Sequence, residues 1–365
     1  MNILFYFPTN QNSVSLETLM KEFALKGHTV FLLGIEERGA IHDTAENYGL
    51  KASVYQIPRS PAALYYVRHI LYFSRFISKN RIDIVYSHTQ PVNFIAVFTQ
   101  YISRAKFYIC RHHSDYIMTE GNKNAMFFDK VINRLGSDFI VPSKKVFHQI
   151  TAVEGVEPRK VRLINYAYDF NDYQKPEAHR VQEIRNQYPA KSLLCTVSRF
   201  IPCKRYDALI NCVSELINTG YDLRLIILGN GPLGEELQNQ VLQLGMADRI
   251  FFIGFTTEVI SFIAASDIVV HFSDSEASNS VIKEAGLMKR LIAICSDFGD
   301  FDDYVENNKS GFVLSKEDPC QDFKNVVEVI YGNHANFAEL GEELYKNVLN
   351  NFSVENVIQA YTEVM

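Results

Sequence analysis

The chain has 365 residues, of which 47% are hydrophobic and 21% charged, and its formal net charge is −6. This length is too great for one typical hydrophobic core and predicts two domains, while the composition excludes a disordered chain. The negative charge argues against a nucleic-acid partner. No apolar run approaches the roughly 18 residues that indicate a membrane-spanning helix.

The N-terminus and the cysteines both favour a cytoplasmic protein. The first ten residues, MNILFYFPTN, read as a short strand and a turn, without the basic start and long apolar stretch of a signal peptide. The six cysteines form no C-x-x-C pair, and three of them lie in strand-like apolar runs. We therefore expect reduced, structural thiols.

Strand-like apolar runs alternate with helical patterns in the first half of the chain, which predicts a parallel α/β sheet. The expected strands are 3–7, 29–33, 82–86, 107–110, 139–141 and a run from 161, and the expected helices are 15–26, 62–78 and 94–101. Ligands bind at the carboxyl ends of such strands. Three places qualify: residues 8–15, His88, and the stretch 111–115.

The last of these places carries the most chemistry. A lone histidine at a strand end, such as His88, is usually a structural group. In Arg111-His112-His113, by contrast, a guanidinium and two imidazoles come together on one turn. They could meet a phosphate or a sugar hydroxyl there.

The helix expected at 62–78 is rich in aromatic and basic residues. An aromatic stripe at helical spacing is most often packed in a core, and we favour that interpretation. The alternative is a face for the acceptor or for an anionic membrane surface, with Arg68 and Arg75 among its cations. A peripheral membrane contact is therefore an open hypothesis.

The second half repeats the α/β pattern after a polar interval. Apolar runs lapse between 171 and 190, where we place a linker between a domain at 1–170 and another at 191–350. Arg199 and Lys204 follow the next strand at a spacing that lets both side chains reach one anion. They would form a diphosphate clamp.

A strand at 223–228 runs into GNGPLG, which begins at Gly229 and matches the G-x-G-x-x-G fingerprint of dinucleotide-binding proteins. That fingerprint needs an acidic residue at the end of the following strand to hold the ribose. Here the strand at 250–255 ends in two threonines, and Pro232 removes an amide from the loop. NAD binding is therefore disfavoured.

Two glutamates, Glu276 and Glu284, stand on either side of a predicted helix start, after a buried strand that ends with Val270. The polar residues between them are Ser278, Asn279 and Ser280. These could cap the helix and leave its first amides free for an anion. The pair would then hold sugar hydroxyls beside a bound phosphate, although acids also favour a helix start for its dipole alone.

The E-x7-E spacing and the sequence after it, AGLMKRLIAICSDFGDFDDYVENNKSG, resemble the donor-site signature of the retaining family 4 glycosyltransferases, which have the GT-B fold. The stretch with Arg199 and Lys204 is similar to the family's G-R-x(n)-K-G element, and G-x-G-P after a strand also occurs there. Some family glycines are replaced. Asn279 stands in the loop, where we expect a left-handed conformation, and Asp300 stands in the G-G pair.

The resemblance implies an α/β protein with the GT-B fold, in which two Rossmann-like domains face a central cleft and the last helix, 351–365, crosses back to the first domain. It implies a retaining, metal-independent hexosyltransferase. The donor would be a nucleoside-diphosphate sugar, with UDP expected as the nucleotide and no other cofactor. The acceptor would be a glycan or a lipid-linked molecule in surface polysaccharide biosynthesis.

The resemblance also implies roles for individual residues. Glu276 would face the anomeric centre, and His112 would contact sugar or phosphate from across the cleft, with His113 as the alternative. Glu284 would hold the ribose hydroxyls. The other donor-binding residues would be Arg199, Lys204, Gly229, Gly231, Ser278, Asn279, Ser280 and Val281.

Two other functions are compatible with the same sequence. One is a nucleotide-sugar epimerase, which would form product without an acceptor. The other is a non-catalytic GT-B partner subunit, which the lost glycines suggest.

Overall fold

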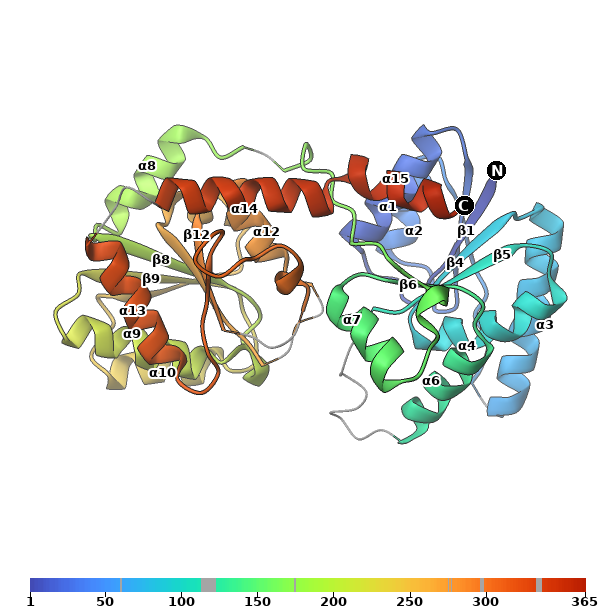
Figure 1. Ribbon diagram of the computed structural model, residues 1–365, viewed down its shortest axis with the longest axis horizontal. Coiled ribbons are helices and arrows are strands. Elements are labelled where there is room, and N and C mark those ends of the chain that lie inside the picture. Colours follow the sequence, from blue (N-terminus) through green and yellow to red (C-terminus); the bar gives the residue numbers. More distant parts are fainter. Residues whose placement is uncertain are drawn as a thin grey trace. The chain divides into compact units, whose positions relative to one another are not determined.

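The computed structural model describes residues 1–59, 61–112, 123–173, 175–274, 276, 278–295, 299–332 and 337–365. These residues form two compact units (Figure 1). Unit 1 consists of Met1–Phe170 and Phe352–Met365, and unit 2 consists of Asn171–Asn351. In each unit, helices cover a parallel sheet.

The sheet of unit 1 has seven strands in the order β3-β2-β1-β4-β5-β6-β7. The strands are β1 (Asn2–Tyr6), β2 (Thr29–Gly34), β3 (Lys51–Val54), β4 (Ile84–His88), β5 (Lys106–Cys110), β6 (Phe139–Val141) and β7 (Val161–Leu163). Phe5 of β1 lies opposite Leu32 and Tyr86 in the parallel register. The strand order reverses between β1 and β4, and ligands of α/β proteins bind beside such a reversal.

Helices pack on both faces of this sheet. They are α1 (Val14–Leu25), α2 (Ala40–Asn47), α3 (Ala62–Asn80), α4 (Gln90–Thr99), α6 (Lys123–Leu135), α7 (Lys144–His148) and α15 (Val354–Val364). The ring of Tyr361 in α15 packs edge-on against Phe23 and Tyr86. The C-terminal helix therefore belongs to the core of unit 1, although the chain from Asn171 to Asn351 belongs to unit 2.

The aromatic stripe of helix α3 is predicted to pack in the core, and one face of the helix confirms this prediction. Tyr65, His69, Phe73 and Ile77 are buried at helical spacing. Another face exposes Leu64, Val67 and Leu71 to solvent. Among the described residues no helix is both long and apolar enough to cross a bilayer.

Unit 2 has a six-stranded parallel sheet in the order β10-β9-β8-β11-β12-β13. Its strands are β8 (Ser192–Val197), β9 (Leu223–Leu228), β10 (Ile250–Gly254), β11 (Ile268–Phe272), β12 (Leu291–Cys295) and β13 (Phe312–Val313). Its helices are α8 (Ala178–Gln187), α9 (Tyr206–Asn218), α10 (Gly234–Gln243), α11 (Val259–Ala265), α12 (Ser280–Leu287), α13 (Pro319–Gly332) and α14 (Phe337–Phe352). Here the strand order reverses between β8 and β11.

Two local features differ from the sequence prediction. The interval 171–190, expected as a linker, contains helix α8 and lies within unit 2. Its apolar residues are few, namely Ala178, Val181 and Ile184, and only Ile184 is buried, so the periodic signal in the sequence is weak. Strand β4 ends two residues later than predicted, so His88 is the buried last residue of the strand and does not stand in the loop after it.

Candidate functional site

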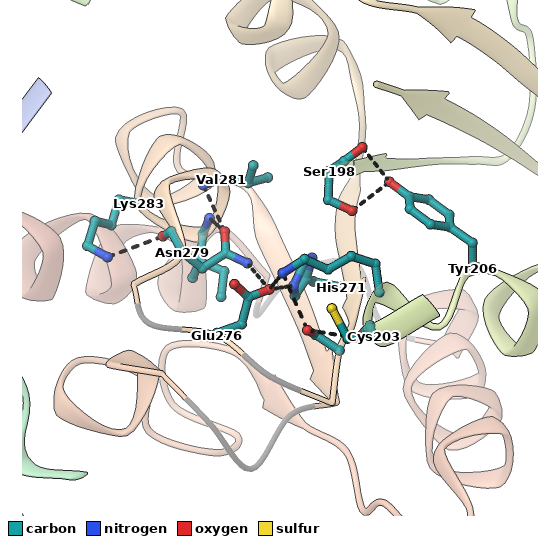
Figure 2. A network of polar contacts seen from close by, with 11 residues as sticks. Ser198, Cys203, Tyr206, His271, Glu276, Asn279, Val281 and Lys283 are labelled. Atoms are coloured by element: carbon teal, nitrogen blue, oxygen red, sulfur yellow. Dashed lines mark hydrogen bonds and ion pairs between the residues drawn. The ribbon is translucent and has the colours of Figure 1, made fainter. Parts of the chain in front are cut away.

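The carboxyl ends of β8 and β11 bring a lysine, a histidine and a glutamate together in unit 2. One oxygen of Glu276, Oε1, accepts hydrogen bonds from Lys204 Nζ, from His271 Nε2 at 2.5 Å and from Asn279 Nδ2 at 3.3 Å. Figure 2 shows His271 and Asn279 directed at this carboxylate. Lys204 lies in the turn after β8, His271 in β11, and Glu276 in the loop after β11. The strand-order reversal thus gathers groups that are distant in sequence.

The charge of Glu276 follows from these contacts. Burial by itself raises the pKa of the carboxyl, but the hydrogen bonds and charges of His271 and Lys204 outweigh burial and lower the pKa to about 2. The carboxylate is therefore ionised at neutral pH. Its second oxygen, Oε2, accepts no hydrogen bond from any residue that the structure describes. We therefore expect a ligand to contact Oε2.

A second buried ion pair fixes the loop after Glu276, and the sequence interpretation missed it. Lys283 Nζ lies 2.8 Å from Asp300 Oδ2, and both side chains are almost fully buried. Lys283 also donates to Ser278 Oγ at 2.9 Å and to the carbonyl oxygen of Asn279 at 3.2 Å. Ser278 in turn donates to Asp300. The hydroxyl of Ser278, predicted to bind the donor, is therefore already engaged within this network.

The start of α12 differs from the prediction. The side chain of Asn279 accepts hydrogen bonds from the amides of Val281 at 2.9 Å and Ile282 at 3.3 Å. The predicted free amides are therefore wrong at these two positions. Asn279 is also in an extended conformation, with φ −96°, and not in the left-handed conformation expected of a glycine replacement. It is a helix cap, and the loop follows a different path from one that requires glycine.

Glu284 lies about one turn into α12, and its environment differs from that of Glu276. Burial raises the pKa of this carboxyl to about 7, against the opposing effects of Lys283 and the hydroxyl of Ser280. Two glutamates eight residues apart thus have their pKa values moved in opposite directions, because His271 and Lys204 outweigh burial at Glu276, whereas burial outweighs Lys283 at Glu284.

The raised pKa of Glu284 makes the stability of the protein depend on pH. A carboxyl that binds its proton more tightly when folded contributes stability below its unfolded pKa, and this contribution is lost as the pH rises through the folded value of about 7. Glutamine does not titrate, so Glu284→Gln does not lose this contribution. The free energy of unfolding of Glu284→Gln, relative to that of wild type, should therefore increase by about 2–3 kcal/mol from about pH 5 to about pH 8. Urea unfolding at both pH values measures this. The prediction is contradicted if the two proteins differ in free energy of unfolding by the same amount at both pH values.

The two members of the predicted clamp have different surroundings. The side chain of Arg199 is exposed and makes no hydrogen bond or ion pair with the described residues, whereas that of Lys204 pairs with Glu276. The residue after Lys204 is Arg205, which has φ 45° and ψ 36°. This is the left-handed conformation for which glycine is the usual choice. An ion pair between Arg205 and Asp274 at 3.0 Å holds the side chain in place.

The glycines of GNGPLG have a packing role. Gly229 has φ 130°, and a Cβ there would collide with the carbonyl oxygen of Ser198. A Cβ on Gly231 would lie 2.5 Å from the carbonyl oxygen of Phe200. The two glycines let this loop lie directly against the backbone on either side of Arg199. Whether they also touch a donor stays a prediction.

In unit 1, His112 forms part of a row of stacked rings at the carboxyl ends of β4 and β5. Its Nε2 lies 3.0 Å from Nδ1 of His88, and its Nδ1 lies 2.8 Å from the hydroxyl oxygen of Tyr166. The three rings are stacked. Burial lowers the pKa of His88 to about 3, so this histidine is neutral. His88 thus contacts the predicted site histidine, and the alternative, His113, lies outside the described residues.

Arg111 does not join this row, so its predicted place beside the ring of His112 is wrong. Its guanidinium is buried and lies 3.4 Å from Asp129 and 3.0 Å from Glu154. It also donates to Asn133 at 2.5 Å. With two carboxylates beside it, Arg111 serves the interior of unit 1, because a buried cation needs such partners.

Comparison with solved structures identifies the fold. The structure of Anabaena HepE in complex with UDP superposes with a TM-score of 0.85 at 20% identity, over 100% of this chain and 99% of that one. The complex of the same protein with UDP-glucose gives a TM-score of 0.81 at 20% identity, with the same coverage. The fold is GT-B.

Comparison with family models identifies the family. Residues 13–171 match the model described as Glycosyltransferase Family 4, and residues 179–347 match the model described as Glycosyl transferases group 1. Together the two matches account for most of both units. The chain belongs to this family of GT-B glycosyltransferases.

Two curated relatives match at similar identity. The poly(ribitol-phosphate) alpha-N-acetylglucosaminyltransferase of Staphylococcus aureus is 20% identical over 223 residues, which are 60% of this chain and 45% of that protein. The N-acetyl-alpha-D-glucosaminyl L-malate synthase of Bacillus anthracis is 21% identical over 214 residues, which are 58% of this chain and 55% of that protein. The match thus spans about half the length of these relatives.

Proposed function

We propose that the protein is a retaining glycosyltransferase that moves a sugar from a UDP-sugar to a glycan or lipid-linked acceptor in surface polysaccharide biosynthesis. The observation that carries this proposal is the state of Glu276. It is an ionised, nearly buried carboxylate at the strand-order reversal of unit 2. Three hydrogen bonds from protein groups hold its oxygen Oε1, and Oε2 is available for a ligand. The occurrence of UDP and UDP-glucose complexes of HepE supports UDP as the nucleotide.

Each part of the donor meets a different group. Arg199 and Lys204 hold the diphosphate and stabilise the negative charge that develops on it as the sugar leaves. Because these two cations supply the positive charge, the reaction needs no metal, and the donor is the only small molecule required. Glu284 accepts hydrogen bonds from the ribose hydroxyls, and Glu276 faces the sugar near its anomeric carbon. We assign no separate base, since an oxygen of the leaving phosphate can take the acceptor's proton.

Unit 1 contributes His112 and the acceptor site. His88 and Tyr166 hold both nitrogens of the His112 ring, so its contact with the sugar or phosphate replaces one of these hydrogen bonds. The name of the Staphylococcus aureus relative, which includes poly(ribitol-phosphate), supports a polymer as the acceptor. The exposed apolar residues of α3 support a peripheral contact with the cytoplasmic face of the membrane.

Titration calorimetry with UDP, GDP and ADP, first without metal and then with magnesium, tests the donor site. We expect UDP to bind without metal. In Lys204→Ala we expect the affinity to fall at least about tenfold, because a charged hydrogen bond to the diphosphate is lost.

Lys346→Ala is the matched control, since it removes an exposed lysine of α14 whose ion pair, with Glu343, lies on its own helix. Its affinity for UDP should equal that of wild type. If wild type binds none of the three nucleotides, or if Lys204→Ala binds UDP as tightly as wild type, the proposed donor site is wrong.

A further inference from the structure

If the proposed function is correct, Lys204 interacts with two different anions. In the structure its ammonium forms an ion pair with Glu276, and both side chains are 11% exposed. In the donor complex the same ammonium is assigned to the diphosphate. Both partners are anions, and a shift of Lys204 toward the diphosphate weakens its contact with the carboxylate. Glu276 and the diphosphate therefore compete for one cation.

The carboxylate cannot easily be left without that cation. A buried charge that loses its partner is strongly destabilising. Part of the binding energy of the donor would be consumed in this way, unless other groups continued to hold Glu276. The structure contains such groups on the same oxygen, Oε1, that Lys204 contacts.

His271 is the strongest of them. Its Nε2 lies 2.5 Å from Glu276 Oε1, and its side chain is 3% exposed. It belongs to β11, where His271 pairs with Ile294 of β12 in the parallel register, so the backbone of the sheet fixes its position. Lys204, by contrast, has a long side chain on a single 3-10 turn. A lysine in this position can exchange one partner for another more easily than the histidine can.

We propose that His271 is a positioning residue that keeps the Glu276 carboxylate in place while Lys204 transfers to the diphosphate of the donor. This inference rests on the proposed function. His271 touches no ligand and acts through Glu276. With the Asn279 amide it holds Oε1 (Figure 2). Oε2 then stays in place to contact the sugar of the donor.

The test is UDP affinity, measured by calorimetry without acceptor, in four variants. His271→Leu removes the N–H group that holds Glu276. Glu276 therefore retains Lys204, and the affinity for UDP falls about tenfold. His271→Gln restores an N–H donor at nearly the same place and recovers most of the loss. Glu276→Gln removes the competing charge, so UDP binds at least as tightly as to wild type. His271→Leu combined with Glu276→Gln returns the affinity to the level of Glu276→Gln alone.

The combined variant separates positioning from a merely structural role. If His271→Leu weakened binding by distorting the sheet, neutralising Glu276 would not restore it. The inference is overturned if His271→Leu binds UDP as tightly as wild type, or if the combined variant binds no more tightly than His271→Leu. It is also overturned if Glu276→Gln alone binds UDP more weakly than wild type. A wild-type protein that does not bind UDP would instead overturn the proposed function itself.

Discussion

Glu276→Gln should lose sugar transfer almost completely, with kcat reduced about a hundred- to a thousandfold, while UDP still binds. The substitution keeps the size of the side chain and removes the negative charge. In wild type His271 and Lys204 keep this carboxyl ionised down to about pH 2, so its charge is present whenever the donor is bound. A charge fixed in advance beside the reacting centre stabilises the transition state more than the bound donor, and its removal therefore reduces kcat.

Initial-rate kinetics with a UDP-sugar and a suitable acceptor measure this effect. Asp274→Asn is the matched control, because this carboxylate lies two residues away in the same loop and forms an ion pair with Arg205. It should retain most of the wild-type activity. Transfer at nearly the wild-type rate by Glu276→Gln would remove Glu276 from its proposed role.

The second large effect is on stability. Asp300→Ala should destabilise unit 2 by about 3–5 kcal/mol, because it leaves the ammonium of Lys283 buried without its counter-ion. Burial already lowers the pKa of Lys283, which shows how unfavourable the charged form is in this position, and Asp300 opposes that shift. The nearby ring of Tyr304, 5.0 Å from the ammonium, cannot replace a carboxylate.

Urea unfolding of the variants tests this prediction. Lys283→Met in the Asp300→Ala background should recover most of the lost stability, since the pair is then replaced by apolar groups of suitable size. Glu306→Ala is the control, because it breaks the exposed pair with Lys309 and should leave the unfolding midpoint unchanged. Equal midpoints for wild type and Asp300→Ala would contradict the prediction.

The buried polar residues near the donor loop carried a weak signal in the sequence. His271 interrupts the apolar run IVVHF, and Lys283 interrupts the apolar positions of the helix SVIKEAG. A charged or polar residue at a position where the pattern requires burial indicates a partner nearby. The pattern does not name that partner. Lys283 finds Asp300 and His271 finds Glu276 only when the strands and loops are assembled.

The sequence by itself determined the α/β class, most of the strands and the family. These features depend on local periodicity and on short motifs, such as E-x7-E and the G-x-G-P loop, which are read without knowing what lies beside them. It also identified Glu276, Glu284, Arg199 and Lys204 as candidates for the donor site, and their roles stay predictions.

Only the tertiary structure decided which of these groups interact. It paired Lys204 with Glu276, gave two similar carboxyls opposite pKa shifts, buried Arg111 among acids and made Asn279 a helix cap. The physical reason is that the free energy of a buried polar group depends on its neighbours in space. In a parallel sheet those neighbours are set by the strand order, which places the ends of β8 and β11 side by side although many residues separate them in the chain.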